Sequence, residues 1–231
     1  MPAHPPVMQA IIQDGYGEPE RVLRLAETEV PSIGSGDVLV RVRATSVNTP
    51  DWATVAGAPY IMRPGIGLRR PRRPVRGSDL AGVVEAVGRH VTDLVPGDEV
   101  FGSTSHHAGA FAQYAAAPAA QLAKKPAGLT FTDAAASVMS GLTALVAVRD
   151  VAQVRAGTRV LINGASGGVG TMAIQIANAL GAEVTGVCGT RNIELVRSLG
   201  ADHLIDYTKE DFTQSKRRFD VILDNVLNHP P

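Results

Sequence analysis

The sequence predicts an α/β protein with two domains, and three observations support this. In the first half, many short strand-like segments are separated by turns containing Gly and Pro, which is typical of a small barrel or sandwich. From residue 158 onward, strand-like and helix-like segments alternate, which indicates a parallel sheet with helices on both faces. Residues 160–170 pass from a short apolar run into a glycine cluster that opens an Ala-rich helical pattern. We therefore expect domains over residues 1–130 and 131–231.

The composition is that of a folded protein without a general affinity for polyanions. Of 231 residues, 45% are hydrophobic and 19% are charged, which allows a sizeable core. The 22 Lys and Arg residues balance 22 Asp and Glu residues, so we expect no nucleic-acid or membrane partner. Residues 1–10 lack a signal-peptide pattern, and we expect no bilayer-spanning segment. Because Cys188 is the only cysteine, we expect no disulfide, no cysteine-rich zinc site and a cytoplasmic location.

Residues 37–45 give the clearest strand pattern of the first half. Val38 and Val40 fall on one face, while Arg41 and Arg43 fall on the other, as in a half-buried strand. Further strands are expected at residues 10–14, 21–29, 80–87, 98–101 and 109–117.

A polar, irregular region follows this strand. Residues 46–52 are turn-like, a short helix is expected up to Gly57, and residues 57–77 are predicted to form a long loop. Five arginines lie in that loop: Arg69, Arg70, Arg72, Arg73 and Arg76. A solvated surface loop is the favoured interpretation, because runs of charge usually face water. The alternative is a loop that attracts an anionic cofactor.

The glycine cluster has the arrangement that binds the pyrophosphate of a dinucleotide. Glycines allow a sharp turn and a close approach of phosphate, and the start of the following helix offers free N–H groups. Ala165 occupies the first position of the common G-x-G-x-x-G pattern, and Gly167 and Gly170 occupy the other two. The predicted cofactor-binding residues here are Gly164, Ala165, Ser166, Gly167, Gly168, Val169 and Gly170. The alternative is an ordinary strand–turn–helix unit without a ligand.

The second half is predicted to form a parallel sheet. A helix over residues 131–147, capped by Thr132 or Asp133 and interrupted at Ser140 and Gly141, precedes it. The expected strands cover residues 159–163, 182–187, 202–206 and 219–224, with helices over 168–180 and 191–199 and a helical turn over 208–214. A dinucleotide domain normally has six strands, so we expect an incomplete sheet with an unpaired edge. Because bare edges promote association, we expect a homo-oligomer or a marginally stable chain.

The end of the second parallel strand favours NADP(H) over NAD(H). In NAD-binding proteins, a carboxylate about 20 residues beyond the glycines holds the adenine ribose. No carboxylate stands in residues 187–192; Thr190 can donate a hydrogen bond there, and Arg191 can pair with the 2′-phosphate of NADP. The alternative is that Arg191 is only a solvated residue at a helix start.

With these residues identified, the chain resembles the medium-chain dehydrogenase/reductase superfamily, above all its zinc-independent quinone oxidoreductases. The matching segments are residues 46–52, 77–84, 96–102, 141–144 and 164–170. The resemblance implies a GroES-like catalytic domain, a Rossmann NADP-binding domain and an active site in the cleft between them. It also implies an NADPH-dependent reductase that transfers hydride to a small-molecule substrate, a quinone or an α,β-unsaturated carbonyl compound.

The same resemblance implies a site without zinc. Zinc-dependent members carry a Cys in the region of residues 48–51 and a His-Glu pair where this chain has Ser78 and Asp79. His106 and His107 form the only His pair, and adjacent residues seldom bind one metal ion, so a loop is the favoured interpretation. Without a Lewis acid, reduction of an electron-poor substrate fits better than alcohol oxidation.

Five further residues receive roles from the resemblance. Asn48 would contact the nicotinamide ribose or the substrate carbonyl, and Asp51 would stabilise its loop. Tyr60 could donate a proton or hydrogen bond to the substrate, although a partly buried aromatic is an equal alternative. Thr143 would support the nicotinamide, unless its hydroxyl bonds back to its own helix. Tyr207 would pack at the adenine end and reach the 2′-phosphate.

The resemblance also marks a departure from the usual chain of the family. Members continue well beyond Asp224, with segments that complete the sheet, supply nicotinamide contacts and return to the catalytic domain. Two other functions therefore stay open: a non-catalytic NADP(H)-binding module, and an interaction protein that presents its sheet edge to a partner. The reductase is the favoured interpretation, because residues from Asn48 to Tyr207 support it.

Overall fold

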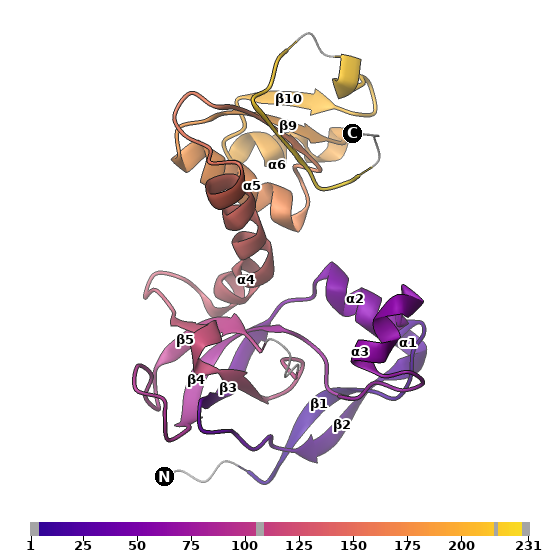
Figure 1. Ribbon diagram of the computed structural model, residues 1–231, viewed down its shortest axis with the longest axis vertical. Coiled ribbons are helices and arrows are strands. Elements are labelled where there is room, and N and C mark those ends of the chain that lie inside the picture. Colours follow the sequence, from indigo (N-terminus) through magenta and orange to yellow (C-terminus); the bar gives the residue numbers. More distant parts are fainter. Residues whose placement is uncertain (1–4, 105–108, 215–216, 228–231) are drawn as a thin grey trace. The chain divides into compact units, whose positions relative to one another are not determined.

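The computed structural model describes residues 5–104, 109–214 and 217–227. The chain forms two compact units, Met1–Met139 and Ser140–Pro231, each with its own sheet and core (Figure 1). The boundary between the units lies within helix α4 (Phe131–Leu145).

The first unit is built on a five-stranded antiparallel sheet in the order β6-β3-β4-β5-β7, together with a two-stranded sheet, β1-β2. Its strands are β1 (Val7–Gln13), β2 (Leu23–Glu29), β3 (Asp37–Thr45), β4 (Asp79–Val87), β5 (Glu99–Ser103), β6 (Tyr114–Pro118) and β7 (Leu122–Lys124). The first six correspond to predicted strands, and β3 has the predicted bounds. β7 is not among the predicted strands, because three residues are too few for a periodic pattern.

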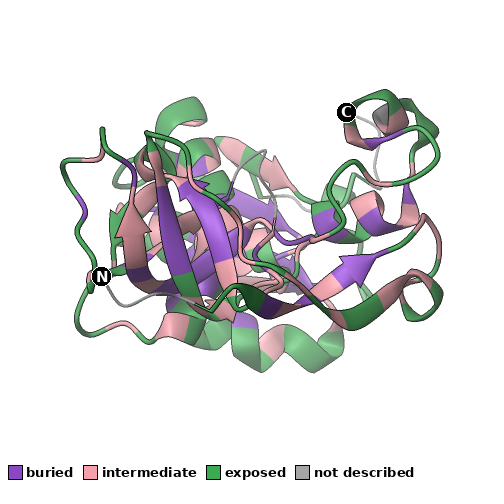
Figure 2. Cartoon of the chain, turned by 90° about the horizontal axis from the view of Figure 1, so that it is seen from below, coloured by how far each residue is buried: buried purple, intermediate pink, exposed green. Residues whose placement is uncertain are grey.

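The core of this unit lies on its middle strands. Val38, Val40 and Leu80 are fully buried and pack in one cluster. Leu39 is also only 2% exposed, so the first half of β3 is buried on both faces. The predicted half-buried alternation therefore holds only for the second half of this strand. Figure 2 shows the buried residues concentrated on strands and the exposed residues on loops and helices.

Short helices connect the strands of the first unit. They are α1 (Pro19–Val22), α2 (Thr49–Ala56), η1 (Tyr60–Met62), α3 (Arg63–Ile66) and η3 (Ala119–Gln121). α2 is the predicted short helix, and Gly57 ends it with a left-handed φ of 65°. Trp52, the only tryptophan of the chain, is 57% exposed on α2. The predicted loop over residues 57–77 contains η1 and α3 and is otherwise irregular.

The second unit is a parallel sheet, as predicted, and its strands lie in the order β10-β9-β8-β11. Its strands are β8 (Arg159–Asn163), β9 (Glu183–Cys188), β10 (His203–Asp206) and β11 (Val221–Asp224). Its helical segments after α4 are η4 (Val146–Val151), α5 (Gly168–Ala179), η5 (Thr190–Asn192), α6 (Ile193–Ser198) and η6 (Phe212–Gln214). β8 has the predicted bounds, and Gly181 beyond α5 has a φ of +79°, as expected after a helix end.

The two faces of this parallel sheet are covered differently. On one face, Val160 and Ile162 pack in one buried cluster with residues of α4, η4, α5 and α6. On the other face, Leu161 lies in a smaller cluster against which Phe212 and Phe219 pack. Helices on both faces were predicted, but in the described part of the chain the second face has only η6. α5 and α6 share a face because the β8-α5-β9 and β9-α6-β10 crossovers have the same hand and run in the same direction across the sheet.

The edge strand β11 is joined to β8 by backbone pairing and by one ion pair. Asp220, just before β11, accepts hydrogen bonds from the backbone N–H of Arg159 at 2.9 Å and from its Nη2 at 2.8 Å. No strand within the described ranges pairs with the other edge of β11.

α4 is more regular than predicted, and it ends two residues before the predicted end, where η4 continues it. It passes through Ser140 and Gly141 without interruption, because one helical glycine costs only about 1 kcal/mol relative to alanine. Thr130 lies at its start, where its Oγ1 accepts the N–H of Asp133 and donates to that carboxylate. With η4 it forms one run, Phe131–Val151, which by length and composition alone could cross a membrane. Helices of soluble proteins meet the same criterion, so this run is weak evidence for a membrane span.

Candidate active site

The glycine turn joins β8 to α5 and leaves no room for a side chain at its closest approach. Gly164 has a φ of +76°, which favours glycine and allows the sharp turn. At Gly170, an added Cβ would lie 2.2 Å from the carbonyl oxygen of Gly164. Ala165 is fully buried, and its N–H donates to the carbonyl oxygen of Val187 at 3.0 Å. The turn is therefore fixed to β9 as well as to β8.

The start of α5 presents backbone N–H groups and has no capping side chain. Gly167 is its N-cap residue, and the helix begins with a 2.9 Å bond from the N–H of Thr171 to the carbonyl oxygen of Gly167. The N–H groups of Gly168, Val169 and Gly170 precede that bond and are available to a ligand. An added Cβ at Gly167 would meet nothing closer than 3.4 Å, so the space there is open. This cradle fits the pyrophosphate of a dinucleotide.

A hydrogen-bonded cluster around Asp206 lies at the carboxyl end of β9 and β10. Thr190 Oγ1 donates to Asp206 Oδ2 at 2.6 Å, and Thr208 Oγ1 donates to Asp206 Oδ1 at 2.6 Å. These bonds hold the pKa of the Asp206 carboxyl below its ordinary range. The hydroxyl hydrogen of Thr190, predicted to be offered to a cofactor, is thus used within the protein. Sequence reasoning missed Asp206, which meets Thr190 only because β10 pairs with β9.

Arg191 and Tyr207 flank this cluster. Arg191 is exposed, and its guanidinium forms no ion pair with a described residue. Tyr207 is 65% exposed and lies against Gly189, where an added Cβ would be 3.2 Å from the phenol oxygen. Asn192, which sequence reasoning also missed, donates from Nδ2 to Ser166 Oγ at 3.1 Å. This bond links the end of β9 to the glycine turn.

In the first unit, polar groups converge on the carboxylate of Asp79. Asn48 Nδ2 donates to Asp79 Oδ2 at 2.9 Å, and Ser46 Oγ donates to the same oxygen at 2.9 Å. The backbone N–H of Met139 is a third donor, at 3.1 Å. Asp79 is only 1% exposed, so these donors rather than water stabilise its charge. We call Asp79, Asn48, Ser46 and Met139 the Asp79 network. The sequence singled out Asp79 only as one of the two positions at which zinc-dependent members of the family carry a His-Glu pair.

Both amide hydrogens of Asn48 are used in this network. Its Nδ2 faces Asp79 because a carboxylate can only accept hydrogen bonds, and the same nitrogen donates to Ser46 Oγ at 3.1 Å. Its Oδ1 faces the N–H of Asp51 in the capping box of α2 and, with two lone pairs, can still accept a hydrogen bond from a ligand. The backbone N–H of Asn48 donates to Asp51 Oδ2 at 2.9 Å, which fixes the start of α2. Burial raises the pKa of the Asp51 carboxyl above its ordinary value, although this hydrogen bond opposes the shift.

Tyr60 has a different environment from the Asp79 network. Its side chain is 73% exposed, so it is not the partly buried aromatic of the alternative interpretation. The guanidinium of Arg63 lies 4.4 Å from the centre of the Tyr60 ring and 4.8 Å from that of Tyr16. The structure thus places Tyr60 in a cation–π contact, and its predicted role toward substrate stays a prediction.

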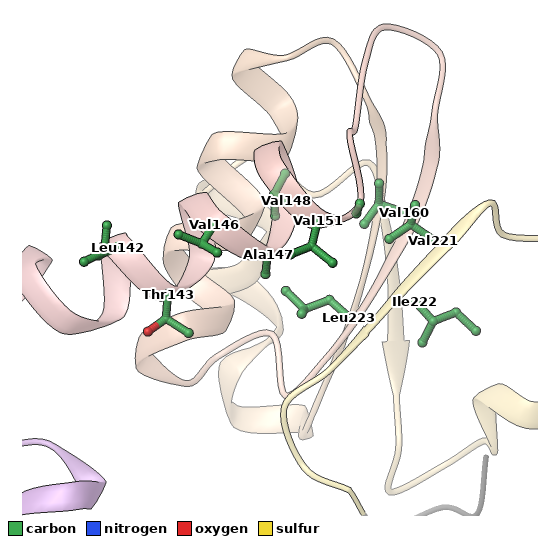
Figure 3. A pocket seen from close by; sticks show the side chains of 11 residues that line it. Leu142, Thr143, Val146, Ala147, Val148, Val151, Val160, Val221, Ile222 and Leu223 are labelled. Atoms are coloured by element: carbon green, nitrogen blue, oxygen red, sulfur yellow. The ribbon is translucent and has the colours of Figure 1, made fainter.

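Thr143 lines an apolar cavity of about 550 Å³ in the second unit. Figure 3 shows the side chains around this cavity, with Thr143, Leu142 and Val146 on α4 and η4 and Leu223 on β11. Thr143 is exposed in this structure, and its predicted support of the nicotinamide stays a prediction.

No group of three or more His, Cys, Asp or Glu side chains within residues 5–104, 109–214 and 217–227 could hold a metal ion. His106 and His107 lie outside these ranges. At the position of the family's His-Glu pair, the hydroxyl of Ser78 lies 3.4 Å from Asp79 Oδ1.

Comparison with known proteins gives the family of the chain. The model of the alcohol dehydrogenase GroES-like domain matches residues 34–127, and that of the zinc-binding dehydrogenase matches residues 168–230. The solved quinone oxidoreductase of Coxiella burnetii is 32% identical, with a TM-score of 0.86 over 95% of this chain and 69% of that one. The chain belongs to the medium-chain dehydrogenase/reductase superfamily. Its GroES-like and Rossmann-like units confirm the predicted fold class and the predicted resemblance.

Other members of this superfamily are similar over most of the chain. A chloroplast envelope quinone oxidoreductase homolog from Arabidopsis thaliana is 37% identical over 207 residues, which are 87% of this chain and 61% of that protein. The Escherichia coli quinone oxidoreductase solved with NADPH is 29% identical, with a TM-score of 0.77 over 88% of this chain and 60% of that one. The chain thus spans about 60% of the length of the curated relatives that it matches.

Proposed function

We propose that this chain is an NADPH-dependent reductase of quinones or α,β-unsaturated carbonyl compounds. The observation that carries the proposal is the glycine turn, where close-packed Gly170 and the open start of α5 form a cradle for pyrophosphate. Relatives named as quinone oxidoreductases, one of them solved with NADPH, support the same chemistry. When bound, the nicotinamide supplies the hydride. The contribution of the protein is to orient the reactants and to stabilise developing charge on the substrate oxygen.

Each unit contributes a different kind of contact in this proposal. In the second unit, residues 164–170 hold the pyrophosphate, Arg191 holds the 2′-phosphate and Tyr207 packs at the adenine end. In the first unit, Asn48 Oδ1 can only accept a hydrogen bond, which suits a ribose hydroxyl and not a substrate carbonyl. Asp51 keeps Asn48 in place through the start of α2.

Two further residues are assigned by resemblance alone. Tyr60 is proposed to donate a hydrogen bond or proton to the substrate, because its exposed phenol is accessible to a ligand. Thr143 is proposed to support the nicotinamide. Tyr60→Phe should lower kcat without changing the affinity for NADPH, and an unchanged kcat would remove Tyr60 from the mechanism.

We infer a preference for NADPH over NADH. Arg191 is exposed at the end of β9, and the carboxylate of Asp206 is occupied by Thr190 and Thr208, which leaves it poorly suited to hold a ribose diol. Arg191→Glu should weaken NADPH binding about tenfold or more relative to NADH, because a repulsive charge replaces a bidentate partner. Arg155→Glu, in the exposed turn before β8, makes the same charge change as a control. Equal losses in both variants, measured by calorimetry, would contradict the inference.

We also propose that the reaction needs no zinc. Ser78 and Asp79 replace the family's His-Glu pair, and Asp79 is already committed to three hydrogen-bond donors. Dialysis against a strong chelator should leave turnover and melting temperature unchanged. A loss that added zinc restores would overturn this part of the proposal.

The direct test follows NADPH oxidation by the purified chain with a naphthoquinone and with cinnamaldehyde. We expect turnover above the uncatalysed rate, and none with Gly170→Val. Calorimetric binding of NADPH without turnover of either substrate would favour the non-catalytic binding module. Absence of NADPH binding would refute both the reductase and the non-catalytic binding module.

Self-association through the free edge of β11 is a further proposal, and a monomer in sedimentation would contradict it.

A further inference from the structure

The first unit contains a pocket that adjoins the Asp79 network and is separate from the apolar cavity of the second unit. It has a volume of about 480 Å³, and its wall includes Ser78 and Met139, both hydrogen-bonded to Asp79. Asp51 lines it as well and accepts the N–H of Asn48. The pocket therefore shares a wall with residues that position Asn48 and Asp79.

Arginine side chains give this pocket its charge. Its lining includes Arg72, Arg73 and Arg76 but only one carboxylate, that of Asp51. Three guanidinium groups therefore face one carboxylate in this lining. The lining is thus formally positive, and a bound anion would complement it.

Arg76 is the buried member of this set, and part of its guanidinium has no partner. The residue is only 7% exposed. Its Nε donates to Gln13 Oε1, and the Tyr16 hydroxyl and the Asp51 carboxylate also act on this guanidinium, while its Nη2 is buried without an acceptor at hydrogen-bond geometry among the described residues. Gln13 cannot readily turn toward Nη2, because its own Nε2 donates to the carbonyl oxygens of Gly15 and Val55. A buried charged donor without an acceptor is destabilising, so an acceptor from a ligand would be stabilising.

We propose that this pocket binds a carboxylate or phosphate group carried by the substrate, with Arg76 as its buried donor and Arg72 and Arg73 at its wall. The substrate class is then an electron-poor carbonyl compound that bears an anionic group. That the anionic group belongs to a substrate rests on the proposed reductase function, whereas the anion site itself rests on the lining of the pocket. The arginine run is therefore divided: Arg72, Arg73 and Arg76 line the pocket, and Arg69 and Arg70 do not.

The first experiment measures binding without turnover. Calorimetry compares benzoate, phenyl phosphate and neutral benzamide on the wild-type chain. We expect at least one of the two anions to bind about tenfold or more tightly than benzamide, and the preferred anion identifies the group. Arg76→Met should abolish that preference, while Arg69→Met, which removes an exposed charge from the same segment, should retain it. Equal binding of anions and benzamide, or equal losses in both variants, would overturn the proposal.

Because Arg76 is buried, its variant requires a folding check by circular dichroism. Should Arg76→Met fail to fold, the double variant Arg72→Gln/Arg73→Gln changes only exposed residues and should weaken anion binding several-fold. Unchanged anion affinity in that folded double variant would overturn the proposal equally.

The second experiment separates the anion site from the reductase function. It compares kcat/KM for cinnamaldehyde with that for 4-carboxycinnamaldehyde, which carries the same enal and one added carboxylate. We expect the charged substrate to be favoured about tenfold in the wild type through a lower KM, and not to be favoured in Arg76→Met. Anion binding that depends on Arg76 without reduction of either aldehyde would refute the reductase alone. Reduction of both aldehydes with equal kcat/KM, and no anion preference in calorimetry, would refute the anion site alone.

Discussion

The glycine turn and the Asp79 network are two candidate sites built in opposite ways. The turn is made by backbone atoms, which approach so closely that an added Cβ at Gly170 would lie 2.2 Å from the carbonyl oxygen of Gly164. The network is made by side chains and one backbone N–H around a carboxylate that is 1% exposed. A backbone site is therefore sensitive to added atoms, and a side-chain site is sensitive to lost atoms or charge.

The largest effect is expected from adding atoms to the backbone site. Gly170→Val should lower the free energy of unfolding by about 3 kcal/mol or more and abolish NADPH binding, because the neighbouring backbone cannot move aside. Urea unfolding and calorimetry measure the two quantities. Gly167→Ala is the matched control: its Cβ would meet nothing closer than 3.4 Å, so its stability should stay within about 0.5 kcal/mol of the wild type. Similar losses in both variants would show that close packing at Gly170 is not the cause.

A smaller loss of stability is expected from removing the Asp79 carboxylate at the centre of the Asp79 network. Asp79→Ala removes the acceptor shared by Asn48, Ser46 and Met139 and should lower the free energy of unfolding by about 2–3 kcal/mol. It should also lower kcat, because Asn48 loses the bond that fixes its amide. Asp93→Asn, in an exposed loop, serves as control in urea unfolding. Wild-type stability in Asp79→Ala would mean that the network contributes little to the fold.

The smallest effect concerns the sheet beneath the glycine turn and depends on pH. Hydrogen bonds from Arg159 lower the pKa of Asp220 to about 2, from an ordinary value of 3.8. Since the folded pKa is the lower one, the pair stabilises the fold above pH 3.8, and this contribution disappears as the pH falls toward 2. The difference in unfolding free energy between wild type and Asp220→Asn should therefore be constant near neutral pH and shrink between pH 4 and pH 2. A difference that does not change with pH would assign the effect to packing instead.

The glycine turn could be predicted from the sequence because all of its determinants are local. A strand, a turn and a helix follow one another over residues 159–179, and the predicted bounds of β8 coincide with the observed ones. The parallel sheet could be predicted as well, because strands and helices alternate along the chain. The interruption predicted in α4 at Ser140 and Gly141 was wrong, because the helix tolerates the small local cost of those residues.

The side-chain contacts could not be predicted in the same way, because they join distant segments. Asn48 and Asp79 are 31 residues apart, and Gln13 and Arg76 are 63 apart. Only the pairing of the strands brings such residues together, and no local pattern specifies which polar groups then meet. The family resemblance assigned Asn48 a role toward the nicotinamide ribose or the substrate carbonyl, which stays a prediction, and the sequence did not indicate which of its atoms would face a ligand. For Arg76, the charge run suggested solvation, whereas the residue is buried.

The position of Trp52 has a practical consequence for these experiments. It is the only tryptophan in the chain, it lies on α2 directly after Asp51, and it is 57% exposed. Intrinsic fluorescence excited at this indole therefore originates entirely in the first unit. Trp52 lines a separate pocket of the first unit together with Val47 and Val55, so quenching or a spectral shift upon titration reports a change in that unit.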